Sequence, residues 1–214
     1  MPRAGLSRDA VVGHALALVD DAGPTGFADL TLARVAARAG VATPSLYKHV
    51  GSLEDLRRGV ALVAVRELGR AAAAATVGRS GPDALRSLAR AIRGYALEHP
   101  GRYAATQVAP DPSSADDLEL SAAGADVVGI VAATLRGFDL EEARTVDVVR
   151  AVRSAVHGFV ALELGGGFGL PDDVGGSYDV LVELLVDGVT GLVGGDDRSA
   201  AADGPGATAG RPGA

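Results

Sequence analysis

The sequence predicts an all-α protein, and three observations support this. Of the 214 residues, 48% are apolar, which is enough to bury a substantial core. Most of these apolar residues are Ala, Val and Leu, and they recur at helical spacing, with no Trp and only four Phe in the chain. Clusters of Gly and Pro separate the periodic stretches, as expected at breaks between helices.

Two helices are expected in the first 40 residues. Residues 7–22 place apolar side chains on one helical face, with Ser7 as the N-cap. Residues 23–26 contain Gly and Pro, which stop this helix because Pro cannot continue it. Thr31 is placed to cap a second helix, and Gly40 supplies the positive φ angle that ends it.

A short helix and a long one follow. The short helix is expected to begin at Thr43 as N-cap with Pro44 at the first helical position, where its missing N–H costs nothing. Gly51 closes it. Ser52 then caps a helix that runs to about Val77.

The rest of the chain predicts further helices, followed by a disordered tail. The expected helical segments are residues 82–99, a short element at 102–108, 115–135, 140–164 and 178–192. Residues 165–177 are rich in glycine and are expected to be irregular. Residues 194–214 are rich in Gly, Ala, Asp and Pro, and they carry no large apolar residue, so we expect them to be disordered.

Charge is distributed unevenly along the sequence. The formal net charge is −7, but residues 1–58 carry seven Lys or Arg against six Asp or Glu, which gives +1. The remaining residues carry 13 against 21, which gives −8. Any contact with a polyanion such as DNA is therefore expected in the first quarter of the chain.

Cysteine usage and hydropathy predict a soluble cytoplasmic protein. The absence of cysteine excludes disulfides and Cys-ligated metal sites, and it fits a reducing compartment. Acidic residues interrupt the N-terminal stretch too soon for a secretory signal. The longest weakly polar run, residues 122–135, falls short of the roughly 20 residues that a membrane span needs.

The short helix presents polar groups outward. On a helical wheel of about 100° per residue, Leu46 and Val50 face inward. The outward face and its flanks are made of four residues: Pro44, Ser45, Tyr47 and Lys48. Hydroxyl, phenol and ammonium groups bind phosphates and can reach base edges. A helix, a short turn with Gly and a second short helix form a helix-turn-helix, although a solvated surface helix is the alternative interpretation.

Residues 31–56, "TLARVAARAGVATPSLYKHVGSLEDL", resemble the DNA-binding domain of the TetR family of transcriptional repressors. The resemblance extends from Leu6 to about Leu68. The positions that carry it are Thr31, Gly40, Val41, Thr43, Ser45, Leu46, Tyr47, His49 and Leu56.

The resemblance implies a role for each residue of this segment. Thr31, Tyr47 and His49 would contact phosphates, and Lys48 would approach the groove. The residues nearest to base edges would be Thr43, Pro44 and Ser45. Many relatives have a lysine early in the next helix, where this chain has Leu53, and the sequence leaves open whether Arg57 or Arg58 replaces that phosphate contact.

Residues 155–169, "AVHGFVALELGGGFG", resemble a C-terminal ligand-binding domain found in part of the same family. Independently, the polar residues on either side of the Pro100-Gly101 break, together with His157, suggest a mostly apolar cavity with a few hydrogen-bonding groups, which fits a site for a small organic effector. The candidate effector-binding residues are Tyr95, His99, Tyr103, Thr106, Gln107 and His157. For each of them alone, a role as an ordinary core or surface residue is the alternative.

Together these features predict a homodimeric transcriptional regulator, a repressor that a small-molecule effector releases from a palindromic double-stranded DNA operator. Residues 1–55 would form the helix-turn-helix DNA-binding domain, and residues 56–193 the effector-binding and dimerisation domain. The apolar faces of residues 148–160 and 178–193 are candidates for a four-helix dimer interface, with Gly188 and Gly191 allowing close approach. The alternative is that these two helices pack only on their own domain.

Two other functions compete with this one. An enzyme is not expected, because the four histidines are scattered and lack a neighbouring nucleophile or metal-ligand spacing. The glycines of residues 165–169 follow a helix instead of a strand, which is wrong for nucleotide binding, so no cofactor or metal is expected. The second rival is an all-α small-molecule-binding or interaction protein without specific DNA binding.

Overall fold

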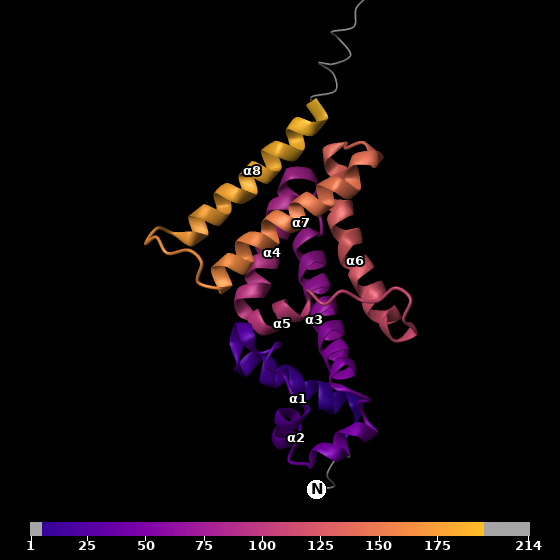
Figure 1. The fold of residues 1–214 in the computed structure, drawn as a ribbon. Helices are drawn as coiled ribbons and strands as arrows, with labels where there is room; N and C mark the ends of the chain where they lie inside the picture. Colours follow the sequence, from indigo (N-terminus) through magenta and orange to yellow (C-terminus); the bar gives the residue numbers. More distant parts are fainter. Residues whose placement is uncertain (1–5, 195–214) are drawn as a thin grey trace, which may run out of the picture.

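The computed structural model describes residues 6–194, and this part of the chain consists of helices and connecting loops with no strand. Helices α1 (Arg8–Asp21) and α2 (Leu32–Ala39) and the 3-10 helix η2 (Thr43–Lys48) gather at one end of the molecule (Figure 1). Helix α3 (Leu53–Thr76) leads from them into the second part. The predicted all-α fold is confirmed.

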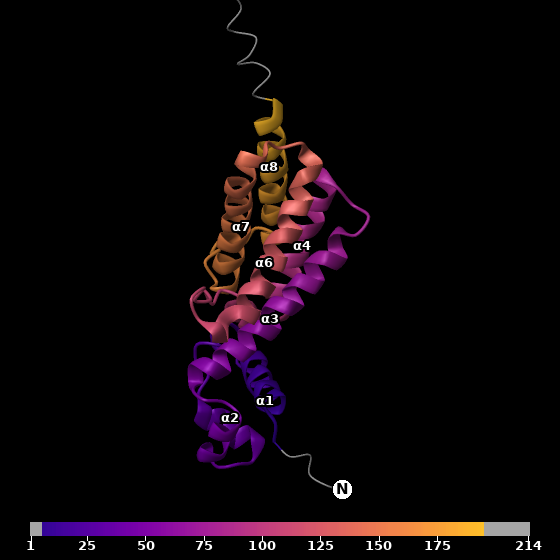
Figure 2. The same cartoon turned by 90° about the vertical axis from the view of Figure 1, so that its right-hand side faces the viewer.

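The second part is a stack of helices beside the upper half of α3. Its elements are α4 (Gly81–Glu98), α5 (Pro100–Ala105), η3 (Ala115–Asp117), α6 (Leu118–Leu135), η4 (Arg136–Phe138), α7 (Glu142–Leu164) and α8 (Val174–Gly194). Figure 2 shows these helices above the N-terminal ones, so that the molecule is elongated. The short 3-10 helix η1 (Gly23–Thr25) connects α1 to the loop before α2.

Helix boundaries in the first 76 residues follow the predicted caps. At three helix starts a hydroxyl oxygen accepts a hydrogen bond from the backbone N–H three residues further along the chain. The pairs are Ser7 with Ala10 (3.1 Å), Thr31 with Arg34 (3.3 Å) and Ser52 with Asp55 (3.0 Å). Each satisfies one backbone donor that a helix start otherwise leaves free. Gly40 ends α2 with φ 68°, in the left-handed region that glycine adopts without steric cost.

The recognition segment differs in detail from the prediction. It is a 3-10 helix, its N-cap is Ala42 instead of Thr43, and it ends at Lys48. Hydrogen bonds from Ser45 N–H to the Ala42 carbonyl (2.9 Å) and from His49 N–H to the Leu46 carbonyl (2.8 Å) span three residues each. This tighter winding suits a segment of only six residues between two turns.

Two other boundaries differ from the prediction. Helix α5 begins at Pro100, because Pro at the first helical position lacks only an N–H that would be unpaired there. Helix α8 begins at Val174, inside the stretch predicted to be irregular, since the Asp173 carboxylate accepts the N–H groups of Gly175 (2.9 Å) and Gly176 (3.0 Å). Of the predicted tail, Gly194 is the last residue of α8 and residues 195–214 lie outside the described part of the chain.

Helix α3 contributes to both main hydrophobic cores. Its N-terminal half places Leu56 and Val60 among the buried side chains of α1, α2 and η2. Its C-terminal half places Leu68 and Ala72 in the larger core of α4 to α8. The two ends of the molecule are therefore joined by one continuous helix.

Helix α5 forms a second connection between the two parts, which we call the α5 junction (residues 100–105). A side chain at Gly101 would bring a Cβ atom to 2.5 Å from the Val19 carbonyl oxygen, so only glycine allows this approach to α1. The Arg102 guanidinium donates to the Asp20 carboxylate of α1 (2.8 and 2.5 Å) and to the Glu67 carboxylate of α3 (2.9 and 2.8 Å). These charge-assisted bonds fix α5 to both helices.

The apolar face predicted for residues 148–160 is buried within the chain itself. Val148, Val149, Val152, Val156 and Val160 all belong to the larger core. They are therefore not available for a dimer interface, because α4, α6 and α8 already pack around α7.

Residues Ala115–Phe138 form a helical stretch that contains an 18-residue window with a mean hydropathy of 1.6, and 28% of that window is buried. By length and composition alone it meets the criteria for a membrane span, whereas the run of residues 122–135 was predicted to be too short. The flanking 3-10 turns lengthen it. Core helices of soluble proteins meet the same criteria, and α6 packs against α3, α4 and α7.

Candidate nucleic-acid interface

The segment η2 is anchored from behind by two apolar side chains. Leu46 and Val50 are almost fully buried, in the same core as Val35 and Ala36 of α2. The Val41 N–H donates to the Ala36 carbonyl at 3.0 Å, which holds the turn between α2 and η2. This packing fixes which side of η2 faces outward.

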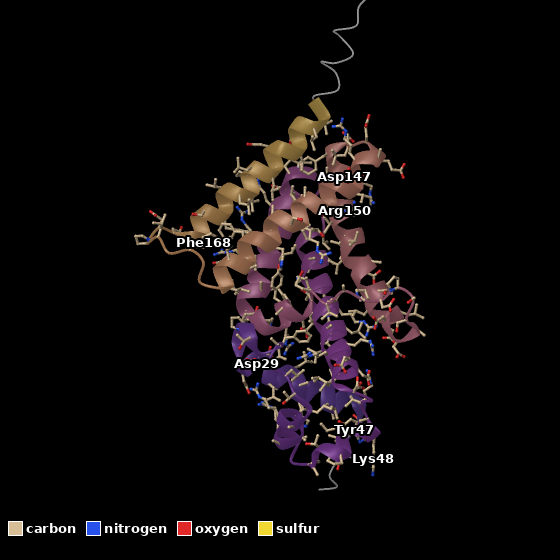
Figure 3. All side chains as sticks on the ribbon, in the orientation of Figure 1. Asp29, Tyr47, Lys48, Asp147, Arg150 and Phe168 are labelled. Atoms are coloured by element: carbon tan, nitrogen blue, oxygen red, sulfur yellow. The ribbon has the colours of Figure 1, made fainter. Side chains whose placement is uncertain are left out.

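The outward side of η2 is polar, as the helical wheel predicts. Tyr47 is 56% exposed, and Pro44 and Lys48 are also exposed. Thr43, Ser45 and His49 are half-buried at its margins. Figure 3 shows Tyr47 and Lys48 at the end of the molecule farthest from α8.

Lys48 carries the only lysine ammonium group of the sequence. Within residues 6–194 no carboxylate forms an ion pair with it. An exposed cation without an internal partner is suited to binding a phosphate.

Two polar residues at the start of α2 are also exposed. Thr31 is exposed and caps the helix, so its oxygen already accepts one hydrogen bond while its O–H can donate. Arg34, which the sequence analysis missed, lies three residues further on and is exposed; one guanidinium nitrogen donates to the Asp29 carbonyl at 3.0 Å. Its spacing from Thr31, on the same helical face, is the signal that identifies it.

Arg57 and Arg58 both contact other groups of the protein. They were the possible replacements for the lysine that many relatives have at the position of Leu53. The Arg57 guanidinium donates to the Ala28 carbonyl at 3.0 Å and lies 6.0 Å from the centre of the Phe27 ring. Arg58 is bound to Asp117 and to Asp55. Both guanidinium groups are used inside the protein.

A cluster around Asp55 holds the N-terminal helices together. Arg8 of α1 donates two hydrogen bonds, of 2.8 and 2.7 Å, to the Asp55 carboxylate at the start of α3. The Gly51 N–H donates a third, of 2.9 Å. These donors lower the pKa of Asp55 to about 2, with the hydrogen bonds from Arg8 as the largest cause.

The candidate effector residues separate into two groups. Tyr103 of α5 and His157 of α7 meet, with 3.0 Å between the phenol oxygen and Nδ1. Tyr95 instead directs its hydroxyl to the Glu67 carboxylate (3.2 Å) and the Ala64 carbonyl (3.3 Å), both on α3, and His99 lies beside its ring.

A pocket of about 270 Å³ lies at the first group, and it has five lining residues: Gln107, Arg150, Arg153, Ser154 and His157. Gln107 and His157 were candidates from the sequence, and Thr106 stands beside them with its hydroxyl bound to the Tyr103 carbonyl at 2.7 Å. Arg150, Arg153 and Ser154 were not predicted from the sequence. They lie three, four and seven residues before His157, which places them on the same face of α7.

The described residues contain no group of three or more His, Asp or Glu side chains that could hold a metal ion.

Comparisons with known proteins agree with this architecture. Residues 85–185 match the family model described as "Tetracyclin repressor-like, C-terminal domain". The chain is 38% identical over 164 residues to Rv0681 of Mycobacterium tuberculosis, an uncharacterized HTH-type transcriptional regulator; the match covers 76% of this chain and 72% of that protein.

Solved structures share the fold. A possible TetR family transcriptional regulator from Streptomyces coelicolor A3(2) superposes with a TM-score of 0.67 at 21% identity, over 87% of this chain and 100% of that one. BioQ, in a structure with its natural double-stranded DNA operator, gives a TM-score of 0.62 at 22% identity, over 87% and 99% of the two chains.

The fold and the exposed face of η2 define a helix-turn-helix protein with a helical second domain. The chain belongs to the TetR family of transcriptional regulators.

Proposed function

We propose that the protein is a DNA-binding repressor that releases a palindromic operator when a small organic molecule binds its second domain. The observation that carries this proposal is the outward face of η2, where Tyr47 and Lys48 stand exposed at the tip of the molecule while Leu46 and Val50 anchor the segment from behind. Thr43, Pro44 and Ser45 would lie nearest to base edges, and Thr31, Tyr47 and His49 would hold phosphates.

The test is operator binding by the double variant Tyr47→Ala, Lys48→Ala, using a palindromic fragment from beside the protein's own gene. We expect a loss of affinity of about tenfold or more and a smaller salt slope, by about one, because one phosphate contact of Lys48 is removed. A matched control is Val77→Ala with Arg79→Ala, an exposed apolar and cationic pair at the far end of α3. Unchanged affinity and salt slope in the first variant would refute the assignment of η2.

A dimer is part of this proposal, because one helix-turn-helix reads few base pairs and paired ones bind half-sites about 34 Å apart. The exposed face of α8 supports it: Val180 and Leu184 are 61% and 64% exposed, and a Cβ atom at Gly188 or Gly191 would meet open space. Exposed apolar side chains aligned along one helix are typical of interfaces.

Sedimentation velocity tests the dimer. We expect Leu184→Glu to shift the protein towards monomer, whereas Val77→Glu, at a residue that is 78% exposed in the turn after α3, leaves the dimer intact. A dimer unaffected by Leu184→Glu would place the interface elsewhere.

We also retain the proposed division into residues 1–55 and residues 56–193, with the qualification that α3 packs in both cores. The alternative function, a ligand-binding protein without specific DNA binding, would be supported if the wild-type chain failed to select its operator over unrelated DNA.

A further inference from the structure

The α7 pocket, defined by Gln107, Arg150, Arg153, Ser154 and His157, is lined by polar and cationic residues, whose aliphatic stems contribute to its surface, and by no carboxylate. The contrast with the larger pocket at the start of α3, about 490 Å³, is informative. That pocket is lined by Arg8 and Arg58 together with Asp55 and Asp116, and both arginines form ion pairs with Asp55. The α7 pocket therefore has an excess of positive charge in a part of the chain that is otherwise acidic.

The two arginines of the α7 pocket have little internal compensation. Among the described residues, no carboxylate forms an ion pair with Arg153. Arg150 has Asp147 at 3.8 Å, but both side chains are more than three-quarters exposed, and such a pair contributes little. Both guanidinium groups remain able to bind an acceptor from solution.

His157 adds a further donor. The Tyr103 hydroxyl is buried, and within residues 6–194 its hydrogen bond is with Nδ1 of His157. A buried O–H must donate, so Nδ1 is the acceptor and the neutral ring carries its proton on Nε2. Burial, assisted by the charge of Arg153, lowers the pKa of His157 and so favours the neutral ring.

The lining therefore presents guanidinium groups, an imidazole N–H and the Ser154 hydroxyl to one small space. Arginine forks match the paired oxygens of a carboxylate or a phosphate. We propose that the α7 pocket is a binding site for a small organic anion, and that the effector of this repressor carries a carboxylate or phosphate group. This identification of the effector class rests on the proposed function; the anion site itself does not.

The site can be tested on the purified full-length protein with ligands of equal shape and different charge. Benzoate, benzamide and benzamidine are an anion, a neutral molecule and a cation of nearly the same size, and inorganic phosphate supplies the second headgroup. The ring signals of histidine in the nuclear magnetic resonance spectrum report binding, with His157 assigned by its absence in His157→Gln. The other three rings are internal controls: His14, His49 and His99.

We expect benzoate, phosphate or both to shift the His157 signal to saturation at millimolar concentration, and the relative affinity of the two anions identifies the preferred headgroup. Benzamide and benzamidine should not shift the His157 signal. Arg153→Gln should weaken anion binding by about tenfold or more, whereas Arg136→Gln, an exposed arginine of η4, should leave it unchanged. Equal binding of the neutral analogue, no saturation by either anion, or an unaffected Arg153→Gln variant would overturn the proposal.

A parallel operator-binding measurement distinguishes failure of the anion site from failure of the proposed repressor function. The wild-type protein is assayed for selective operator binding alongside its anion titration. If the wild-type protein selects its operator but binds no anion, the anion site alone is refuted. Anion binding without selective operator binding refutes the proposed function and leaves the site in place.

Discussion

Replacement of Asp55 by Asn tests how the N-terminal helices are held in register. The Asp55 carboxylate receives two hydrogen bonds from Arg8 of α1 and one from the Gly51 N–H, and its side chain is 23% exposed. An asparagine has nearly the same shape but keeps only one acceptor oxygen and no charge. We expect Asp55→Asn to fold with the same helices and with lower stability.

The pKa of Asp55 sets the size of this effect and its pH range. A fall from the usual 3.8 to about 2 corresponds to about 2 kcal/mol of unfolding free energy. Because the pKa is lower in the folded state, this contribution is complete above about pH 4. It is lost as the pH falls from about 4 to about 2, since the unfolded chain binds the proton first.

Urea unfolding followed by circular dichroism measures the effect, at fixed protein concentration so that any dimer contributes equally. The difference between the wild type and Asp55→Asn should be about 2 kcal/mol at pH 7 and should shrink towards zero near pH 2. Asp126→Asn, at an exposed residue of α6, is the control and should differ little from the wild type at any pH. A difference that stays constant between pH 7 and pH 3 would show that the lost interaction does not depend on the carboxylate charge.

Three further substitutions probe the α5 junction and the α7 pocket. Gly101→Ala should destabilise by about 1–3 kcal/mol and lower Tm in calorimetry, because the added methyl group would meet backbone oxygens of α1 and η1 at 2.5 and 2.7 Å; an unchanged Tm would mean that α5 shifts freely. Arg102→Met should cost about 1–2 kcal/mol, and Arg90→Met, whose ion pair is more than half exposed, below about 0.5 kcal/mol; equal costs would contradict the role of the junction. Tyr103→Phe should cost about 1 kcal/mol and change the His157 ring signal, and an unaltered signal would argue against the Tyr103–His157 hydrogen bond.

Much of the N-terminal part was predictable from the sequence because its signals are local. Ser7, Thr31 and Ser52 cap helices as predicted, and Gly40 adopts the left-handed conformation. Leu46 and Val50 are buried as the α-helical wheel predicts, although η2 winds as a 3-10 helix and ends at Lys48, before Val50.

The features that the sequence did not reveal depend on which surfaces meet in three dimensions. The valines of α7 form an apolar face in the sequence, but only the packing of α4, α6 and α8 decides that this face is internal. Arg150 and Arg153 gain significance only when Tyr103 and Gln107 of another segment lie against their helix. The early start of α8 at Val174 was predictable in principle, because Asp173 before two glycines is an N-cap that the glycine-rich composition obscured.

In the α5 junction, two neighbouring residues contact the two different parts of the molecule. Arg102 is tied to α1, and its immediate neighbour Tyr103 is tied to the wall of the α7 pocket. A helix of six residues is about 9 Å long and too short to bend appreciably, so it moves as a single piece. Displacement of Tyr103 would disturb the large core, to which its ring belongs, and would also act on α1 through the neighbouring Arg102.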